Sequence, residues 1–176
     1  MQAGDFETSA RELDTILAEA PDHQDALYMG AATARYRGET GKAFGFLDRL
    51  KRTAPDYGRA FQEEGHLRRK TGDTDGAILA FQRAVRYNPS LTASWTALAE
   101  LFTSIGRSSE AAEATAQARR LQSLPRELLA VTNFIHEGRV LHAEKLVRAF
   151  LQKHPQNVEG MRLLADIGTR LSLIHI

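Results

Sequence analysis

The chain has 176 residues, of which 43% are hydrophobic and 26% are charged, a composition that is ordinary for a soluble domain with a core. Lys and Arg number 23 against 22 Asp and Glu, so no overall field favours nucleic acid or an anionic membrane as the partner. The lack of cysteine excludes disulfides, thiolate zinc sites and a cysteine nucleophile. Without a secretory signal or an apolar run of roughly 18 residues, the sequence favours a soluble, cytoplasmic protein.

Glycine and proline mark the chain at a nearly constant interval. The glycines recur with spacings of 34, 34, 34 and 32 residues, and proline follows 17 residues later in most copies, as in Gly72 and Pro89. A period of this length is typical of repeat proteins. It divides each repeat into two segments. The repeat glycines are Gly4, Gly38, Gly72, Gly106 and Gly138.

Each segment has the apolar pattern of an amphipathic helix. Trp95, Leu98 and Phe102 fall three and four positions apart, which predicts a single apolar face. No segment alternates with period two, so no strand is expected. Proline ends the second helix of most repeats because it disfavours helical backbone before it, and glycine allows the tight turn between the two helices. In chain order the predicted helices are 5–19, 23–37, 39–53, 57–71, 73–87, 91–105, 107–122, 125–137, 139–153 and 157–171.

These features resemble the tetratricopeptide repeat (TPR). The resemblance is carried by Trp95, Leu98, Ala99 and Phe102 in one first helix, followed by Gly106, Ala111 and Ala118. It implies an all-α, right-handed α-solenoid of about ten helices over residues 1–171, in which each repeat is stabilised by its neighbours. Alanine five places after four of the glycines, as at Ala77, would let helices approach closely. Glu64 and Arg68 depart from the pattern, which has apolar residues at those positions.

A second resemblance concerns the last third of the chain. Residues 133–171 (NFIHEGRVLHAEKLVRAFLQKHPQNVEGMRLLADIGTRL) and the earlier run PDYGRAFQEEGHLRR are similar to the repeat region that precedes the catalytic domain of bacterial TPR-containing sulfotransferases. The phosphosulfate-binding loop of that family is absent from the sequence. The resemblance therefore implies that any such chemistry would lie in a domain outside this chain.

The two ends do not complete the repeat pattern. The helix predicted at 5–19 matches the second half of a repeat, and the register would place a turn glycine at Ser172, where the chain instead reads SLIHI. Solenoids normally end in a helix with a polar outer face. We therefore expect incomplete first and last repeats, a frayed or artefactual tail at 172–176, and a chain that is a piece of a longer protein.

No motif for catalysis, cofactors or metals stands out. Neither GxxxxGK[ST] nor a strand followed by GxGxxG occurs, and His136 and His142 lack the companions of a zinc site. The neighbouring acids Glu63 and Glu64 point in different directions on a helix, so we expect them on solvated faces. Trp95 has a core position in the repeat. We therefore expect no catalytic, cofactor-binding or metal-binding residue.

The remaining candidate site is the exposed stripe on the first helix of each repeat, which lines the concave surface of such a solenoid. Arginines on this stripe could grip the carboxylates of an acidic or extended peptide. The alternative is a solvated basic face without a specific role. The predicted peptide-binding residues are Tyr28, Arg35, Arg59, Gln62, His66, Arg69 and Arg162.

The sequence thus predicts a protein-interaction scaffold that recognises a peptide or domain on its concave groove and has no catalysis of its own. The alternative is the N-terminal repeat region of a sulfotransferase that presents a protein substrate to a catalytic domain. Nucleic acid and membranes are not expected as partners. The oligomeric state is open, and self-association through the uncovered end helices is a third hypothesis.

Overall fold

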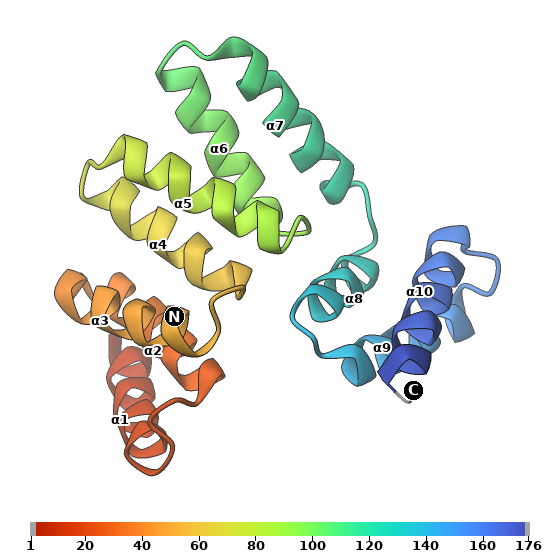
Figure 1. Cartoon of the computed structure of the whole chain (residues 1–176), viewed down its shortest axis with the longest axis horizontal. Coiled ribbons are helices and arrows are strands. Elements are labelled where there is room, and N and C mark those ends of the chain that lie inside the picture. The colour runs from red at the N-terminus through yellow and green to blue at the C-terminus, as the bar shows by residue number, and fades with distance from the viewer. Residues whose placement is uncertain (1–2, 175–176) are drawn as a thin grey trace. The chain divides into compact units, whose positions relative to one another are not determined.

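Ten α-helices make up residues 3–174, the part of the chain that a computed structural model describes; side chains are described for Thr8 and for residues 11–172. The helices are α1 (Ala3–Glu19), α2 (Gln24–Arg37), α3 (Thr40–Thr53), α4 (Gly58–Lys70), α5 (Thr74–Tyr87), α6 (Thr92–Ser104), α7 (Ser108–Gln122), α8 (Arg126–His136), α9 (Val140–Lys153) and α10 (Val158–Ile174) (Figure 1). No strand occurs in residues 3–174. The predicted all-α class is confirmed, and most helix ends lie within one residue of the prediction.

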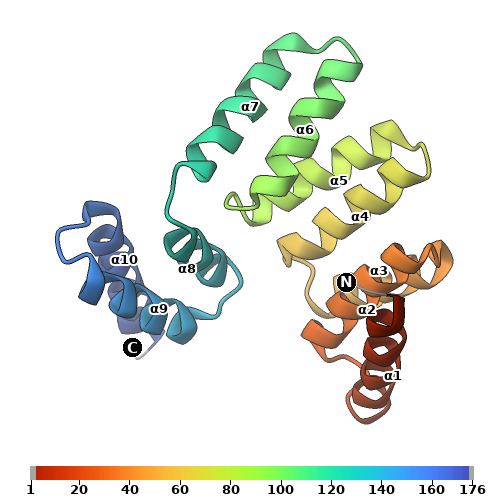
Figure 2. The ribbon, with the colours of Figure 1, turned by 180° about the vertical axis from the view of Figure 1, so that it is seen from behind.

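Successive helices pair into antiparallel hairpins, α2 with α3, α4 with α5, α6 with α7 and α8 with α9, which Figure 2 shows from behind. Left-handed glycines at Gly38, Gly72, Gly106 and Gly138 close the turns, with φ between 73° and 81°. A side chain is strained at such φ values, so the sequence needs glycine at these places. Gly4 differs from the other repeat glycines, because it lies inside α1 instead of in a turn.

The structure divides the chain into two compact units, Met1–Tyr87 and Asn88–Ile176. The core of the first unit comprises fully buried residues of α2, α3 and α4, among them Leu27, Leu47 and Leu67. In the second unit one apolar cluster joins α8, α9 and α10 through residues such as Val131 and Val147. In both units the buried residues recur with helical spacing, as the sequence predicts.

Small residues let the two helices of a hairpin approach closely. Ala43, Ala77, Ala111 and Ala143, each five places after a turn glycine, are all buried, as expected. Gly65 on α4 has the same role, because a Cβ built on it would lie 2.7 Å from the ring of Phe81 on α5. The aromatic ring therefore occupies the space that a side chain at this position would need.

The last helix, α10, runs through Ser172 to Ile174. The tail predicted at 172–176 thus begins within this helix, and its residues 175 and 176 lie outside the described part of the chain. None of the described helices is long and apolar enough to cross a membrane.

Candidate functional site

Six of the predicted site residues lie on the first helices of the two complete hairpins in the first unit. Tyr28 and Arg35 are on α2, and Arg59, Gln62, His66 and Arg69 are on α4. All are half-buried except Arg69, which is exposed. The Tyr28 ring meets the buried Tyr57 ring edge-on at 6.0 Å, and His66 meets Phe81 in the same way at 5.0 Å. These contacts hold the side chains of Tyr28 and His66 in place.

Arg35 is bound within the protein. Its Nε donates a hydrogen bond of 2.7 Å to Glu63 on α4, and its guanidinium lies 4.4 Å from the ring centroid of Tyr36. Although burial disfavours the charged form, the ion pair with Glu63 raises the pKa of Arg35 above its usual value. Arg35 therefore joins α2 to α4, and its part in a ligand site stays a prediction.

The neighbouring acids Glu63 and Glu64 are not on a solvated face, and that expectation was wrong. Their exposed fractions are 5% and 7%. The reason is that the preceding hairpin supplies a cation for each. Arg35 of α2 binds Glu63, and Lys51 of α3 donates a hydrogen bond of 3.0 Å to Glu64. Two consecutive carboxylates thus fasten α4 to both helices of the hairpin before it.

The departures from the TPR pattern at Glu64 and Arg68 have the same explanation. Arg68 binds Glu64 at 2.9 Å, one turn away on α4, and also Asp73 at 2.6 Å in the turn before α5. A chain of ion pairs therefore occupies the space that apolar side chains fill in a regular repeat. Because Glu64 is buried, loss of its cationic partners would leave an uncompensated charge, which is costly.

The seventh predicted residue, Arg162, lines a pocket of about 520 Å³ in the second unit. The pocket is formed by the loop before α6, the end of α7, and one face each of α8 and α10. Its apolar lining comes from residues such as Leu121, Leu124 and Ile135. Its charged lining consists of Arg120, His136, Glu159, Arg162, Asp166 and Arg170.

Three guanidinium groups face two carboxylates in this pocket. Arg162 makes two hydrogen bonds to Glu159, at 2.6 and 2.9 Å, and these bonds lower the pKa of Glu159. Arg170 binds Asp166 at 3.1 Å. A guanidinium has five N–H donors, and the Arg162 side chain is 64% exposed, so donors remain for a ligand. With Arg120 the pocket has an excess of one positive charge.

His136 is the titratable group of the pocket. Partial burial, together with the positive charge of Arg170, lowers the pKa of the imidazole. The ring is therefore neutral near pH 7 and can both donate and accept a hydrogen bond. In the described part of the chain no group of three or more His, Asp or Glu side chains is arranged to hold a metal ion.

The sequence analysis identified Arg162 but missed Arg120, His136 and Arg170. Arg120 belongs to α7, a second helix, whereas the predicted concave stripe consists of first-helix residues. Arg170 lies eight residues after Arg162, about two helical turns, so the same stripe extended along α10 would have included it. The position of Arg120 in the last turn of α7 gave no separate signal.

Comparison with known proteins identifies the family. The tetratricopeptide repeat family matches residues 1–58 and 63–124, more than half of the chain, and the protein belongs to this family. No curated protein matches the sequence closely enough to add a relative.

Solved structures of similar fold include MamA, with 17% identity, a TM-score of 0.60 and coverage of 98% of this chain and 92% of that chain. A thermophilic TPR protein of Thermus thermophilus, TTC0263, has 19% identity, a TM-score of 0.58 and coverage of 93% and 91%. Similarities at this level of identity show the fold. The chain is a TPR scaffold-type protein, a class that in general mediates protein–protein interaction and is not catalytic.

Proposed function

We propose that the protein binds a partner protein through the pocket lined by Arg120, His136, Arg162 and Arg170, and that the bound segment carries an acidic side chain beside an apolar one. The observation that carries this proposal is the composition of the pocket, in which an excess positive charge lies next to the half-buried side chains of Leu121 and Leu124. A carboxylate can accept paired hydrogen bonds from a guanidinium.

The pocket also has a suitable size for one or two side chains. A volume of about 520 Å³ falls within the range of sites that enclose small ligands or anchoring residues. An acidic side chain near Arg162 would compete with Glu159 for the guanidinium. The apolar residue would cover Leu121 and Leu124, and the burial of that surface would supply much of the affinity.

In the first unit, the stripe of Tyr28, Arg59, Gln62, His66 and Arg69 is proposed as a second contact surface. Arg35 belongs to it only in part, because its guanidinium already binds Glu63. Replacing Arg69 by Glu tests this surface separately from the pocket. Undiminished partner binding by that variant would remove the stripe from the site.

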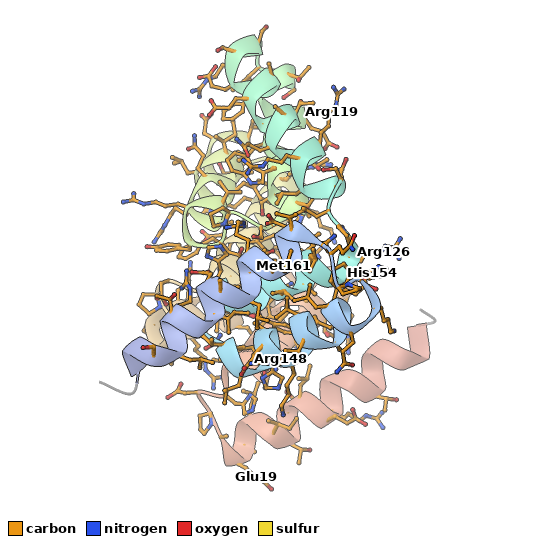
Figure 3. The ribbon with its side chains drawn as sticks, turned by 90° about the vertical axis from the view of Figure 1, so that its right-hand side faces the viewer. Glu19, Arg119, Arg126, Arg148, His154 and Met161 are labelled. Atoms are coloured by element: carbon orange, nitrogen blue, oxygen red, sulfur yellow. The ribbon has the colours of Figure 1, made fainter. Side chains whose placement is uncertain are left out.

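The experiment for the pocket begins with selection of binding peptides from a random library on the wild-type protein, followed by titration of the best peptide. We expect selected peptides to be enriched in Asp and Glu, and Arg162→Glu to weaken binding at least tenfold, because a charge-assisted hydrogen bond contributes about 1.5–3 kcal/mol. Arg148→Glu is the matched control, since Arg148 is an exposed α9 arginine paired with Glu144 on its own helix. Figure 3 labels Arg148 on α9. If Arg148→Glu weakened peptide binding as much as Arg162→Glu, the pocket would not be the binding site.

The sulfotransferase alternative rests on the resemblance of residues 133–171 alone. Under this alternative, the same repeats would present a protein substrate to a catalytic domain. Reading the gene beyond residue 176 tests it. A βα unit with a phosphosulfate-binding loop would support the alternative, and any other continuation would remove it. The cytoplasmic location likewise stays a prediction.

A further inference from the structure

The first helix, α1, presents a face that every complete hairpin buries. In α3, α5, α7 and α9 the residue 12 places after the turn glycine is buried against the hairpin, with exposed fractions of 0% for Leu50, 0% for Ala84, 5% for Ala118 and 5% for Phe150. The equivalent residue of α1 is Ile16, 12 places after Gly4, and it is 41% exposed. Helix α1 therefore has the pattern of a second helix whose own first helix is not beside it.

The last helix, α10, has the pattern of a first helix on which no second helix packs. Seven places before the turn glycine, three of the first helices carry the buried residues Ala31, Gly65 and Val131, where the second helix of the hairpin packs. The equivalent residue of α10, Ala165, is exposed, as is Gly168 one turn later. Nothing lies within 4 Å of a Cβ built on Gly168, whereas Ala34 of α2, which likewise lies four places before the turn position, is buried.

Met161 belongs to the same face of α10 and is 46% exposed. It corresponds to Phe61 of α4, which is 1% exposed. Figure 3 shows α9 and α10 side by side and labels Met161 on α10. The face of α10 formed by Met161, Ala165 and Gly168 is thus apolar and exposed to solvent, with small residues at its centre. These are the properties expected of a surface on which a second helix packs.

We propose that α1 of one copy of this chain packs on the Met161, Ala165 and Gly168 face of α10 in a second copy, and so completes a repeat between the two molecules. The repeat register supports α1 as the occupant, because Ile16 falls where the other second helices bury their apolar residue.

Such a contact joins two different surfaces, so it is head-to-tail. Each molecule has one α1 face that packs on a second copy and one α10 face on which the α1 helix of another copy packs. A change on either face leaves the other intact, which allows the two faces to be tested separately and then combined.

The experiment measures molar mass by light scattering over a range of protein concentrations. Ile16→Glu removes the α1 face, and Gly168→Lys removes the α10 face while placing a helix-favouring residue where there is open space. Leu141→Glu is the control, since Leu141 is 62% exposed on α9. We expect the mass of the wild type and of the control to rise with concentration. Each face variant alone should associate at least tenfold more weakly.

Mixing the two face variants gives the decisive result. Ile16→Glu keeps an intact α10 face and Gly168→Lys keeps an intact α1 helix, so an equimolar mixture should form pairs in a ratio of one to one and no larger species. A monomeric wild type would overturn the proposal, and so would self-association of Ile16→Glu alone, which would mean that α10 pairs with itself. Far-UV circular dichroism checks that each variant has kept its helices.

Discussion

Helices α4 and α5 approach closely at Gly65. Replacing a helical glycine by alanine normally stabilises a protein, but at Gly65 we expect this replacement to destabilise it. Gly65→Ala gains about 1 kcal/mol of helix propensity. Its new methyl group, however, would lie 2.7 Å from the Phe81 ring, well inside an ordinary contact distance of about 3.5–4.0 Å. Phe81 is completely buried, so the ring cannot move toward solvent. Overpacking of this kind costs about 1–3 kcal/mol, and we take the upper value here.

The net prediction for Gly65→Ala is a loss of about 2 kcal/mol. Gly168→Ala is the matched control, because a Cβ at Gly168 has nothing within 4 Å and only the propensity gain of about 1 kcal/mol remains. Urea unfolding followed by circular dichroism at 222 nm should therefore separate the two variants by about 3 kcal/mol, with wild type between them. If Gly65→Ala were as stable as Gly168→Ala, the close packing of the α4–α5 hairpin would be refuted.

Three further predictions concern polar groups. Glu64→Gln should lower the free energy of unfolding by about 1–2 kcal/mol in urea, because Lys51 and Arg68 each lose an ion pair with this buried carboxylate; an unchanged midpoint would mean that these pairs contribute nothing. Asn88→Ala should cost about 1–3 kcal/mol in the same assay, since Asn88 is 2% exposed and accepts a backbone hydrogen bond; a neutral effect would contradict its role. The hydrogen bond from Arg68 lowers the pKa of Asp73, so the stability from this pair is present above the usual Asp pKa and is lost as pH falls through the lowered one. In an NMR titration Arg68→Ala should return the Asp73 pKa upward, and no change would rule out Arg68 as the cause.

The helices and turns were predictable from the sequence because the signals are local. Glycine with positive φ and proline after the second helix both act through the backbone of a few neighbouring residues. The spacing of apolar residues such as Leu98 and Phe102 then gives the buried face. The prediction of a turn at Gly4 was wrong, because glycine is tolerated inside a helix when the surrounding residues favour helix formation.

The polar contacts could not be predicted in the same way. Besides Arg68 on the same helix, Glu63 and Glu64 have cationic partners 28 and 13 residues away in the chain, on helices that become neighbours only when hairpins stack. The sequence shows two adjacent acids, and nothing local distinguishes a solvated pair from a buried one. The pocket at Arg162 was unpredictable for the same reason: it combines residues that are distant in the chain, since Arg120 reaches it from α7, 42 residues earlier.

The most direct test of the proposed function is a charge exchange between the pocket and its ligand. Arg162→Glu should lose affinity for an acidic peptide selected on the wild type and regain it, at least in part, when the peptide's acidic residue is replaced by lysine. Isothermal titration of the four combinations of protein and peptide gives the coupling between the two sites. A coupling above about 1 kcal/mol would support recognition in this pocket. If the lysine peptide bound wild type and Arg162→Glu equally, the pocket would not be where the partner binds.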